Sequence, residues 1–283
     1  MSPYIKIIIA SLLWGATGIF VREAGDMPAY ALAFFRAFIP AFFIAIWLKS
    51  RNNKQKIFRE KWRWMLLGSS LNTLRTLLFF TSFSLTTIAN AQVTLYSWPI
   101  WAALFGFIFI KEKISSSQIT LLFTAFIGLV IMFSQSSFSF NDKHFMGVAA
   151  MALSAIIHSI VVIIFKKHGA HYKSIELVFF QNLIAPVIFL PLIISFLPKL
   201  NFSQILIASL LGLFVGVIAF SLFFSGLKDM KTASAAQITY IEPICGIIFG
   251  YFLYNETINQ AQILGAALIL GSTFVLPLLK KKA

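Results

Sequence analysis

A glutamate beside a proline stands in the middle of a long apolar run of this chain. Residues 237–243 read QITYIEP, and the run around them extends from Thr232 to Tyr254, long enough to cross a bilayer as a helix. A carboxylate at such depth is costly to bury, so Glu242 is a candidate to hold a substrate ammonium or to carry a proton. A structural ion pair with an arginine would also explain it, and both explanations can hold together.

A near-copy of this stretch lies about 145 residues earlier in the chain. Residues 92–99 read QVTLYSWP, inside the apolar run Ile88–Ile110. Trp98 precedes the proline in this copy, whereas Glu242 does so in the later one. Each proline leaves a helix carbonyl without its donor, which a membrane helix tolerates where a neighbour or a cavity supplies the partner. The two copies therefore predict a site with one acidic and one aromatic wall.

Three further ionisable side chains fall well inside apolar segments. Arg75 follows Asn72 by three residues, so the two share a helix face, and an arginine fork can bind a carboxylate or phosphate through two hydrogen bonds. His158 titrates near neutrality and is a candidate proton relay, although an interhelical hydrogen bond explains it equally well. Arg75 could instead balance the charge of Glu242. Arg36 could bind substrate or backbone carbonyls that a proline leaves unpaired.

Amides and aromatic rings near the two prolines complete the candidate site. Glutamine recurs at the same place in both copies, and such side chains either line a cavity or join helices. Aromatic rings clustered there suit a pocket for a flat or amphipathic solute. Besides the ionisable residues, we predict that the substrate is bound by Trp14, Asn72, Gln92, Tyr96, Trp98, Trp101, Gln237 and Tyr240.

The composition is that of an integral membrane protein. Hydrophobic residues make up 59% of the 283 positions and charged residues 11%, against roughly a quarter in soluble domains. The net charge is +14, and the basic residues cluster between the apolar runs. They form no basic groove interleaved with aromatic residues. We therefore expect a lipid bilayer, and no nucleic acid, as a partner. A single cysteine, Cys245, excludes a disulfide framework and a cysteine-based metal site. We predict neither a metal nor a cofactor.

Ten apolar segments are long enough to span a membrane, which predicts an all-α fold. They are Tyr4–Arg22, Ala29–Lys49, Trp64–Phe83, Ile88–Ile110, Ser116–Ser134, Phe145–Phe165, Ile175–Leu197, Phe202–Gly226, Thr232–Tyr254 and Gln260–Leu279. With a cytoplasmic N-terminus, alternation places 18 basic residues inside and three outside, so both termini are predicted to be cytoplasmic. The loop Lys49–Arg63 and the terminal Lys280–Lys282 carry much of this excess.

The ten segments form two copies of a five-helix unit, residues 1–135 and 136–283. Thr87–Gln118 aligns with Thr232–Gln262. Because five is odd, the copies insert with opposite orientation, and such inverted repeats place the substrate near the midplane beside interrupted helices. The predicted interruptions and hinges are the prolines Pro40, Pro99, Pro186 and Pro243. Matched acids, Glu112 and Glu256, lie at the ends of the fourth and ninth segments, where capping and solvation explain them. Gating by salt bridges to Lys111, Lys113 or a neighbouring loop is the alternative.

These residues resemble the EamA-type family of the drug/metabolite transporter superfamily over essentially the whole chain. The resemblance rests on Trp14-Gly15, Phe34-Phe35-Arg36, Arg75, Pro99 with Glu112, Tyr240-Ile241-Glu242-Pro243 with Glu256, Gly265 and Gly271. It implies transport of a small metabolite across a bacterial inner membrane, by alternating access through a central cavity. Members export amino acids or their relatives, while others import metabolites such as S-adenosylmethionine or carry nucleotide-sugar-like molecules.

Two other function classes fit the residues poorly. A membrane-embedded enzyme would need paired mid-membrane acids, a histidine cluster or a Ser-His-acid set, and an ion channel would need rings of charge or carbonyls. No Walker-type phosphate loop occurs, so a gradient or an exchange of solutes must drive transport. We expect a secondary transporter, not an enzyme, for an amino acid or related amphipathic solute, acting as a monomer or homodimer. Uptake of a nucleotide-like metabolite such as S-adenosylmethionine is the alternative.

Overall fold

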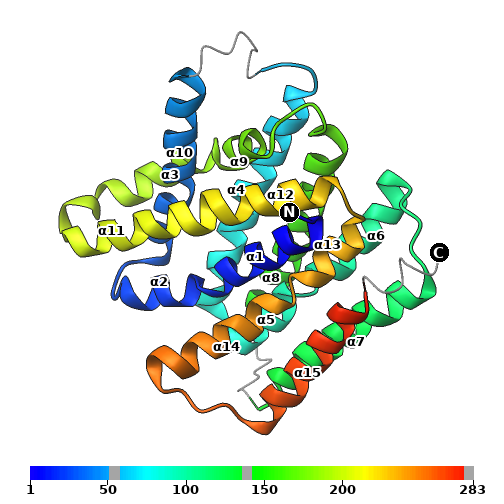
Figure 1. The fold of residues 1–283 in the computed structure, drawn as a ribbon. Coiled ribbons are helices and arrows are strands. Elements are labelled where there is room, and N and C mark those ends of the chain that lie inside the picture. Colours follow the sequence, from blue (N-terminus) through cyan, green and yellow to red (C-terminus); the bar gives the residue numbers. More distant parts are fainter. Residues whose placement is uncertain (51–57, 136–141, 277–283) are drawn as a thin grey trace.

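The computed structural model describes residues 1–50, 58–135 and 142–276, which fold into a bundle of helices (Figure 1). No strand occurs in these ranges, as the all-α prediction requires. The helices are α1 (Pro3–Gly15), α2 (Thr17–Glu23), α3 (Ala29–Ser50), α4 (Trp62–Leu85), α5 (Ile88–Leu95), α6 (Trp98–Ile110), α7 (Ser116–Met132), α8 (Asp142–His168), α9 (Ser174–Asn182), α10 (Ala185–Ile194), η1 (Leu197–Lys199), α11 (Phe202–Leu211), the π-helical stretch η2 (Gly212–Ala219), α12 (Phe220–Lys228), α13 (Thr232–Ile238), α14 (Ile241–Tyr254) and α15 (Gln260–Val275).

These helices form ten segments that coincide with the ten predicted ones to within a few residues. Helices α1 and α2 make segment 1, α5 and α6 segment 4, α9 and α10 segment 7, α11, η2 and α12 segment 8, and α13 and α14 segment 9. Helices α3, α4, α7, α8 and α15 make segments 2, 3, 5, 6 and 10. Six segments are long and apolar enough to cross a membrane, and the bent pair α9–α10 makes a seventh.

The other three segments are shorter or more polar. Helices α7 and α15 have 17 and 16 residues, whereas α4 has 24 residues, including polar side chains at its centre. The predicted end of segment 10 at Leu279, the basic run Lys280–Lys282 and positions 51–57 of the basic loop lie outside the described residues.

Three of the four prolines predicted to interrupt helices do stand at an interruption. Pro99 and Pro243 lie in the first turns of α6 and α14, directly after the breaks in segments 4 and 9. Pro186 lies in the first turn of α10, which is bent by 42° from α9. Pro40, however, lies inside the continuous helix α3, so the interruption expected there is absent.

Close packing by segment 8 accounts for the continuity of α3. A proline at position 40 deprives the Arg36 carbonyl of its helical donor. Gly216 of η2 lies against this point, where a Cβ atom would come within 2.8 Å of the Arg36 oxygen and 2.7 Å of the Pro40 ring. Only glycine allows this approach, and the neighbouring helix then supports α3 through the proline.

The contacts between segments repeat when the two halves of the chain are exchanged. Segment 3 packs on segment 6 as segment 8 packs on segment 1, and segment 4 packs on segment 6 as segment 9 packs on segment 1. Segments 2 and 7, 4 and 9, and 5 and 10 each pack on their own counterpart. Helices α7 and α15 run side by side at one edge of the bundle (Figure 1). This is the packing expected of two inverted five-helix repeats.

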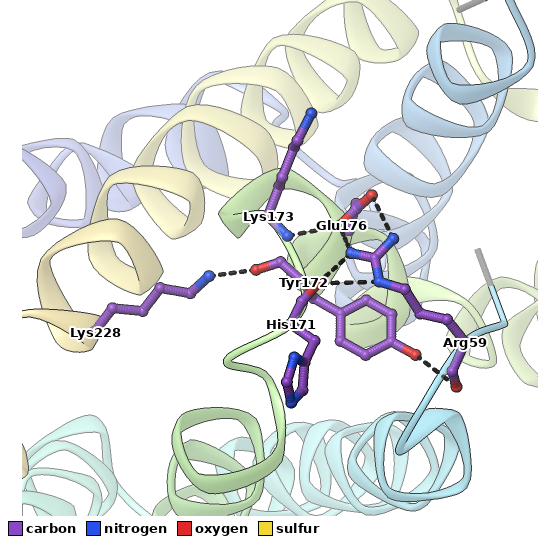
Figure 2. A network of polar contacts seen from close by, with 6 residues as sticks. All are labelled: Arg59, His171, Tyr172, Lys173, Glu176 and Lys228. Carbon is purple, nitrogen blue, oxygen red and sulfur yellow. Dashed lines mark hydrogen bonds and ion pairs between the residues drawn. The ribbon is translucent and has the colours of Figure 1, made fainter. Parts of the chain in front are cut away.

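A polar network ties three segments together at the end of the bundle where α9 begins (Figure 2). The Arg59 guanidinium, just before α4, pairs with Glu176 of α9 at 2.6 Å. The Tyr172 phenol donates to the Arg59 carbonyl at 3.3 Å, and Lys228 at the end of α12 donates to the Tyr172 carbonyl. Burial raises the pKa of Tyr172, so its hydroxyl stays protonated and remains a donor. Segments 3, 7 and 8 are therefore held together at this end.

Candidate functional site

Segments 4 and 9 meet where each of them is interrupted. Ile100 donates its N–H to the Ser97 carbonyl, so the Tyr96 carbonyl has no donor from its own helix turn. The Tyr240 hydroxyl donates to that carbonyl instead, at 2.9 Å, and the two tyrosine rings lie 6.2 Å apart. Each copy of the repeated stretch thus contributes one tyrosine to a single crossing of interrupted helices, which we call the crossing.

Glu242 lies beside the crossing, in the first turn of α14. Its side chain is half-buried and interacts electrostatically with the Tyr96 phenol and with Arg36 of α3. The ion pairs found among residues 1–50, 58–135 and 142–276 all join other partners, so no basic side chain there lies within 4.0 Å of its oxygens. The direct ion pair that would make Glu242 purely structural is not formed.

Arg75 is held in place by its own helix. Its Nε donates to the Asn72 Oδ1 at 3.1 Å, and one terminal nitrogen lies 3.5 Å from the Thr76 hydroxyl. The residue is only 7% exposed, yet none of the carboxylates described lies within 4.0 Å of it. A buried guanidinium without an acid is costly, and its fork is shaped for a planar anion. The arrangement can therefore receive a carboxylate from a ligand.

The four ionisable residues predicted from their depth in the membrane belong to one cluster. Arg36 interacts electrostatically with Glu242, with Arg75 and with His158, so these charges on α3, α4, α8 and α14 share one region of the interior. The two arginines exceed the single acid by one positive charge. This region can hold a ligand that brings both an ammonium and at least one carboxylate.

Aromatic rings form a wall beside this cluster. Trp14 packs on Phe220 and Phe223 with ring centroids 4.9 and 5.1 Å apart, and Trp98 packs edge-on against His158 at 4.7 Å. Trp14 Nε1 and His158 Nδ1 are buried without a hydrogen-bond partner in the described structure. Buried polar atoms without a partner are rare. Each of them could therefore receive a polar group of a ligand.

The remaining predicted residues divide between the site and the packing around it. Gln237 is buried and donates to the Ser272 carbonyl at 3.2 Å, so it joins segments 9 and 10. Gln92 is half-buried in segment 4. Trp101 packs against Phe105 along α6 at a centroid distance of 6.3 Å, and its contact with substrate stays a prediction.

Asn72 compensates for the break in segment 7. Its Nδ2 donates to the Gln181 carbonyl at 3.0 Å, while the Ser69 hydroxyl accepts the Ile184 N–H at 3.2 Å. Both backbone groups flank the break between α9 and α10. Asn72 therefore positions Arg75 and supports the broken helix, while its contact with substrate stays a prediction.

Replacing Asn72 with leucine should lower thermal stability, because the Gln181 carbonyl and the Arg75 Nε would both lose a partner. Each buried polar group left unsatisfied costs about 1–3 kcal/mol. The unfolding midpoint of the detergent-purified protein measures this loss. The control is Ser70→Ala, an exposed position two residues earlier on the same helix. Equal midpoints for N72L and S70A would contradict the role given to Asn72.

Sequence reasoning missed the phenylalanines of segment 8. Phe220 lies under Arg36, whose Cζ is 6.0 Å from the ring centroid, and Phe223 contacts both tryptophans of the wall. The available signal was the cluster of aromatic residues in 220–224, which reads FSLFF. In a chain with 32 phenylalanines that signal does not separate a lining residue from one facing lipid.

The chain is similar to known transporters over nearly its whole length. An uncharacterized transporter of Archaeoglobus fulgidus is 24% identical over 95% of this chain and 94% of its own length. The S-adenosylmethionine uptake transporter of Rickettsia conorii is 21% identical, covering 100% and 97%. The pseudopaline exporter CntI of Pseudomonas aeruginosa is 22% identical, covering 99% and 97%.

A solved crystal structure matches this fold with a TM-score of 0.85 at 19% identity, covering 99% of this chain and 98% of the other. That likeness establishes a shared fold. The model of the EamA-like transporter family matches residues 1–134 and 145–277. The chain therefore belongs to the EamA-like transporter family and is a multi-pass membrane transporter of this type.

Proposed function

We propose that this protein is a secondary transporter for a small solute that carries an α-amino acid group, an amino acid or a related amphipathic molecule. The observation that carries the proposal is a pair of opposite charges, Arg75 and Glu242, which have no direct ion pair of their own and both interact electrostatically with Arg36. Arg75 is buried without a carboxylate, and Glu242 is half-buried without a direct basic partner among the described residues. A zwitterion satisfies both, with its carboxylate on Arg75 and its ammonium on Glu242.

The rest of the cluster supports an amphipathic solute. Trp14, Trp98, Phe220 and Phe223 supply an apolar aromatic surface beside the charges. Ligand sites of this kind are mostly apolar with a few placed polar groups that fix orientation. The neutral Tyr96 phenol interacts with the Glu242 carboxyl group and leaves its charge available to a ligand.

Uptake of S-adenosylmethionine is the second candidate, favoured by relatives named as uptake transporters for it. This solute carries the same α-amino and α-carboxyl groups, so Arg75 and Glu242 would serve it in the same way. It adds a sulfonium charge, which the excess of arginine in the cluster would repel. That repulsion is why we place an amino acid first.

We infer alternating access about the crossing, with the two repeats, residues 1–135 and 136–283, as the moving units. Pro99, Pro186 and Pro243 stand at helix interruptions and are the proposed hinges. We place the protein in a bacterial inner membrane with both termini in the cytoplasm, which fits the distribution of basic residues. A solute gradient, a proton gradient or exchange would drive it.

The test is a panel of radiolabelled solutes in membrane vesicles. Amino acids, S-adenosylmethionine and nucleotides are loaded one at a time, and flux is followed with and without a proton gradient. We expect flux of at least one solute that carries an α-amino acid group and none of nucleotides. Flux of nucleotides alone would contradict the proposal.

A further inference from the structure

The same acidic turn is built at the ends of segments 4 and 9. Lys111 and Asn255 both have left-handed backbone, with φ of 59° and 54°, directly before Glu112 and Glu256. The glutamate N–H then donates to the carbonyl of a glycine six residues earlier, Gly106 at 3.1 Å and Gly250 at 3.2 Å. A Cβ on either glycine would crowd or overlap the carboxylate, so glycine lets the acid fold back over its own helix.

Glu112 uses this turn to bind two segments of the other half. Its carboxylate accepts the Thr232 N–H at 2.7 Å and the Thr232 hydroxyl at 3.1 Å, at the start of α13. It also pairs with Lys166 near the end of α8 at 2.6 Å. The two charged side chains are only 12% and 11% exposed. The partner is thus Lys166, and neither Lys111 nor Lys113 is the lysine engaged.

Glu256 stands in the equivalent place at the opposite end of the bundle but holds only part of the equivalent set. It pairs with Arg22 of α2 at 2.9 Å, and these side chains are 54% and 59% exposed. The spacing of about 145 residues that relates Thr87 to Thr232 also relates Arg22 to Lys167, beside Lys166. Within the described chain, no hydrogen bond joins Glu256 to the Thr87 N–H.

The end at Glu256 is also hollowed. A cavity of about 200 Å³ lies between segments 1 and 9 there, and its lining includes Ile19, Arg22, Phe249, Gly250, Tyr254 and Glu256. A cavity of the same volume lies at the other end, at the start of α4, and is lined by residues 61–64. At the other end, the buried pair of Glu112 and Lys166 and the network around Glu176 (Figure 2) join the segment ends. The Glu112 end is therefore fastened by a buried ion pair, whereas the corresponding pair at the Glu256 end is exposed.

We propose that Glu112 and Glu256 are alternating latches, positioning residues that fasten one end of the transporter at a time. When the Glu112 latch releases, Glu256 draws Arg22 in and takes the Thr87 N–H, as Glu112 now takes Thr232. The inference rests on the alternating access of the proposed function, but it does not depend on which solute is carried. Breaking a buried charge pair is strongly unfavourable, whereas an exposed pair contributes little, so the fastened end sets the resting conformation.

The alkylation rate of a cysteine introduced in place of Ile19 reports how open the Glu256 end is, and the measurement needs no substrate. The protein is purified in detergent with Cys245→Ala and Ile19→Cys, and the rate of reaction with N-ethylmaleimide is measured. Glu112→Gln should lower this rate roughly fivefold, because the population moves to the state closed at Ile19. Lys166→Gln should act in the same direction, which covers the case in which E112Q does not fold. Glu60→Gln, an exposed acid paired with Lys61, is the matched control and should leave the rate unchanged.

A second variant tests the reciprocal latch. Thr87 has φ of −69° and ψ of 154°, values that proline adopts, so Thr87→Pro removes the N–H while fitting the present conformation. Added to E112Q, it should restore the alkylation rate to near that of the parent. The control Thr87→Ala keeps the N–H and should not restore it.

An unchanged or faster rate in both E112Q and K166Q, or no restoration by T87P, would overturn the latch proposal. Alkylation is independent of transport, so these outcomes are separate from the solute panel. Flux of the expected solutes with unchanged alkylation would leave the transporter proposal standing and remove the latches.

Discussion

Replacing Glu242 with glutamine is expected to reduce transport to background. Glutamine has nearly the same shape, and the hydrogen bond from the Tyr240 hydroxyl to the Tyr96 carbonyl does not involve position 242, so the crossing of segments 4 and 9 should keep its structure. The variant loses only the negative charge that a substrate ammonium or a coupling proton would use. Loss of one partner of a buried charge pair costs about 2–5 kcal/mol, which corresponds to a roughly 30- to 4,000-fold loss of flux.

The measurement is the initial flux of the best solute from the panel, in vesicles matched for protein content. Glu60→Gln serves as the control, because this exposed acid lies before α4 and outside the charge cluster. Its flux should equal that of the parent. Parent-like flux in E242Q, at equal protein level, would show that transport does not require the charge of Glu242.

Replacing Arg75 with lysine is expected to reduce flux at least about tenfold, although the positive charge remains. Lysine is a point charge and cannot present the planar fork that binds a carboxylate through two bonds. It also loses the Nε–H that Asn72 holds at 3.1 Å, so the charge is no longer fixed in direction. A geometric loss of about 1.4 kcal/mol or more corresponds to this tenfold effect.

The measurement is the concentration of solute that gives half-maximal flux, which should be higher for R75K than for the parent. The matched control is Arg63→Lys, an exposed position on the same helix, where the same chemical change should have no effect. An unchanged half-maximal concentration in R75K would mean that the substrate carboxylate lies elsewhere.

Segment positions were predictable from sequence because the membrane imposes a length of about 20 apolar residues on each helix. The breaks in segments 4 and 9 were also predictable, since Pro99 and Pro243 recur at matched positions. It was not predictable that Pro40 would lie inside a continuous helix whereas Pro186 would follow a break. Gly216 packs against α3 at Pro40, whereas Ser69 and Asn72 satisfy the backbone broken before Pro186, and these partners come from other segments.

The candidate site was predictable to the extent that it consists of charges. A charge deep in a bilayer is rare enough to identify Glu242, Arg75, Arg36 and His158 one by one. Their neighbours could not be identified in this way. Asn72 shares a helix face with Arg75, but its bond to the Gln181 carbonyl depends on how segment 7 breaks.

The aromatic side chains set a similar limit. Phe220 and Phe223 belong to a wall that forms only when segments 1, 4 and 8 come together. The latch of Glu112 depends likewise on Lys166 and Thr232, which are distant in sequence. A periodic pattern of apolar residues specifies helices, but it does not specify which faces meet.

Competition between charge-deleted analogues tests the central claim most directly, namely that Glu242 and Arg75 together receive a zwitterion. Flux of the radiolabelled amino acid that emerges from the panel is measured against three unlabelled competitors: the same amino acid, its carboxamide and its deaminated acid. We expect the amide and the deaminated acid each to compete at least about tenfold more weakly than the amino acid. The amide leaves Arg75 without a carboxylate, and the deaminated acid leaves Glu242 without an ammonium. Equal competition by either analogue would contradict this claim.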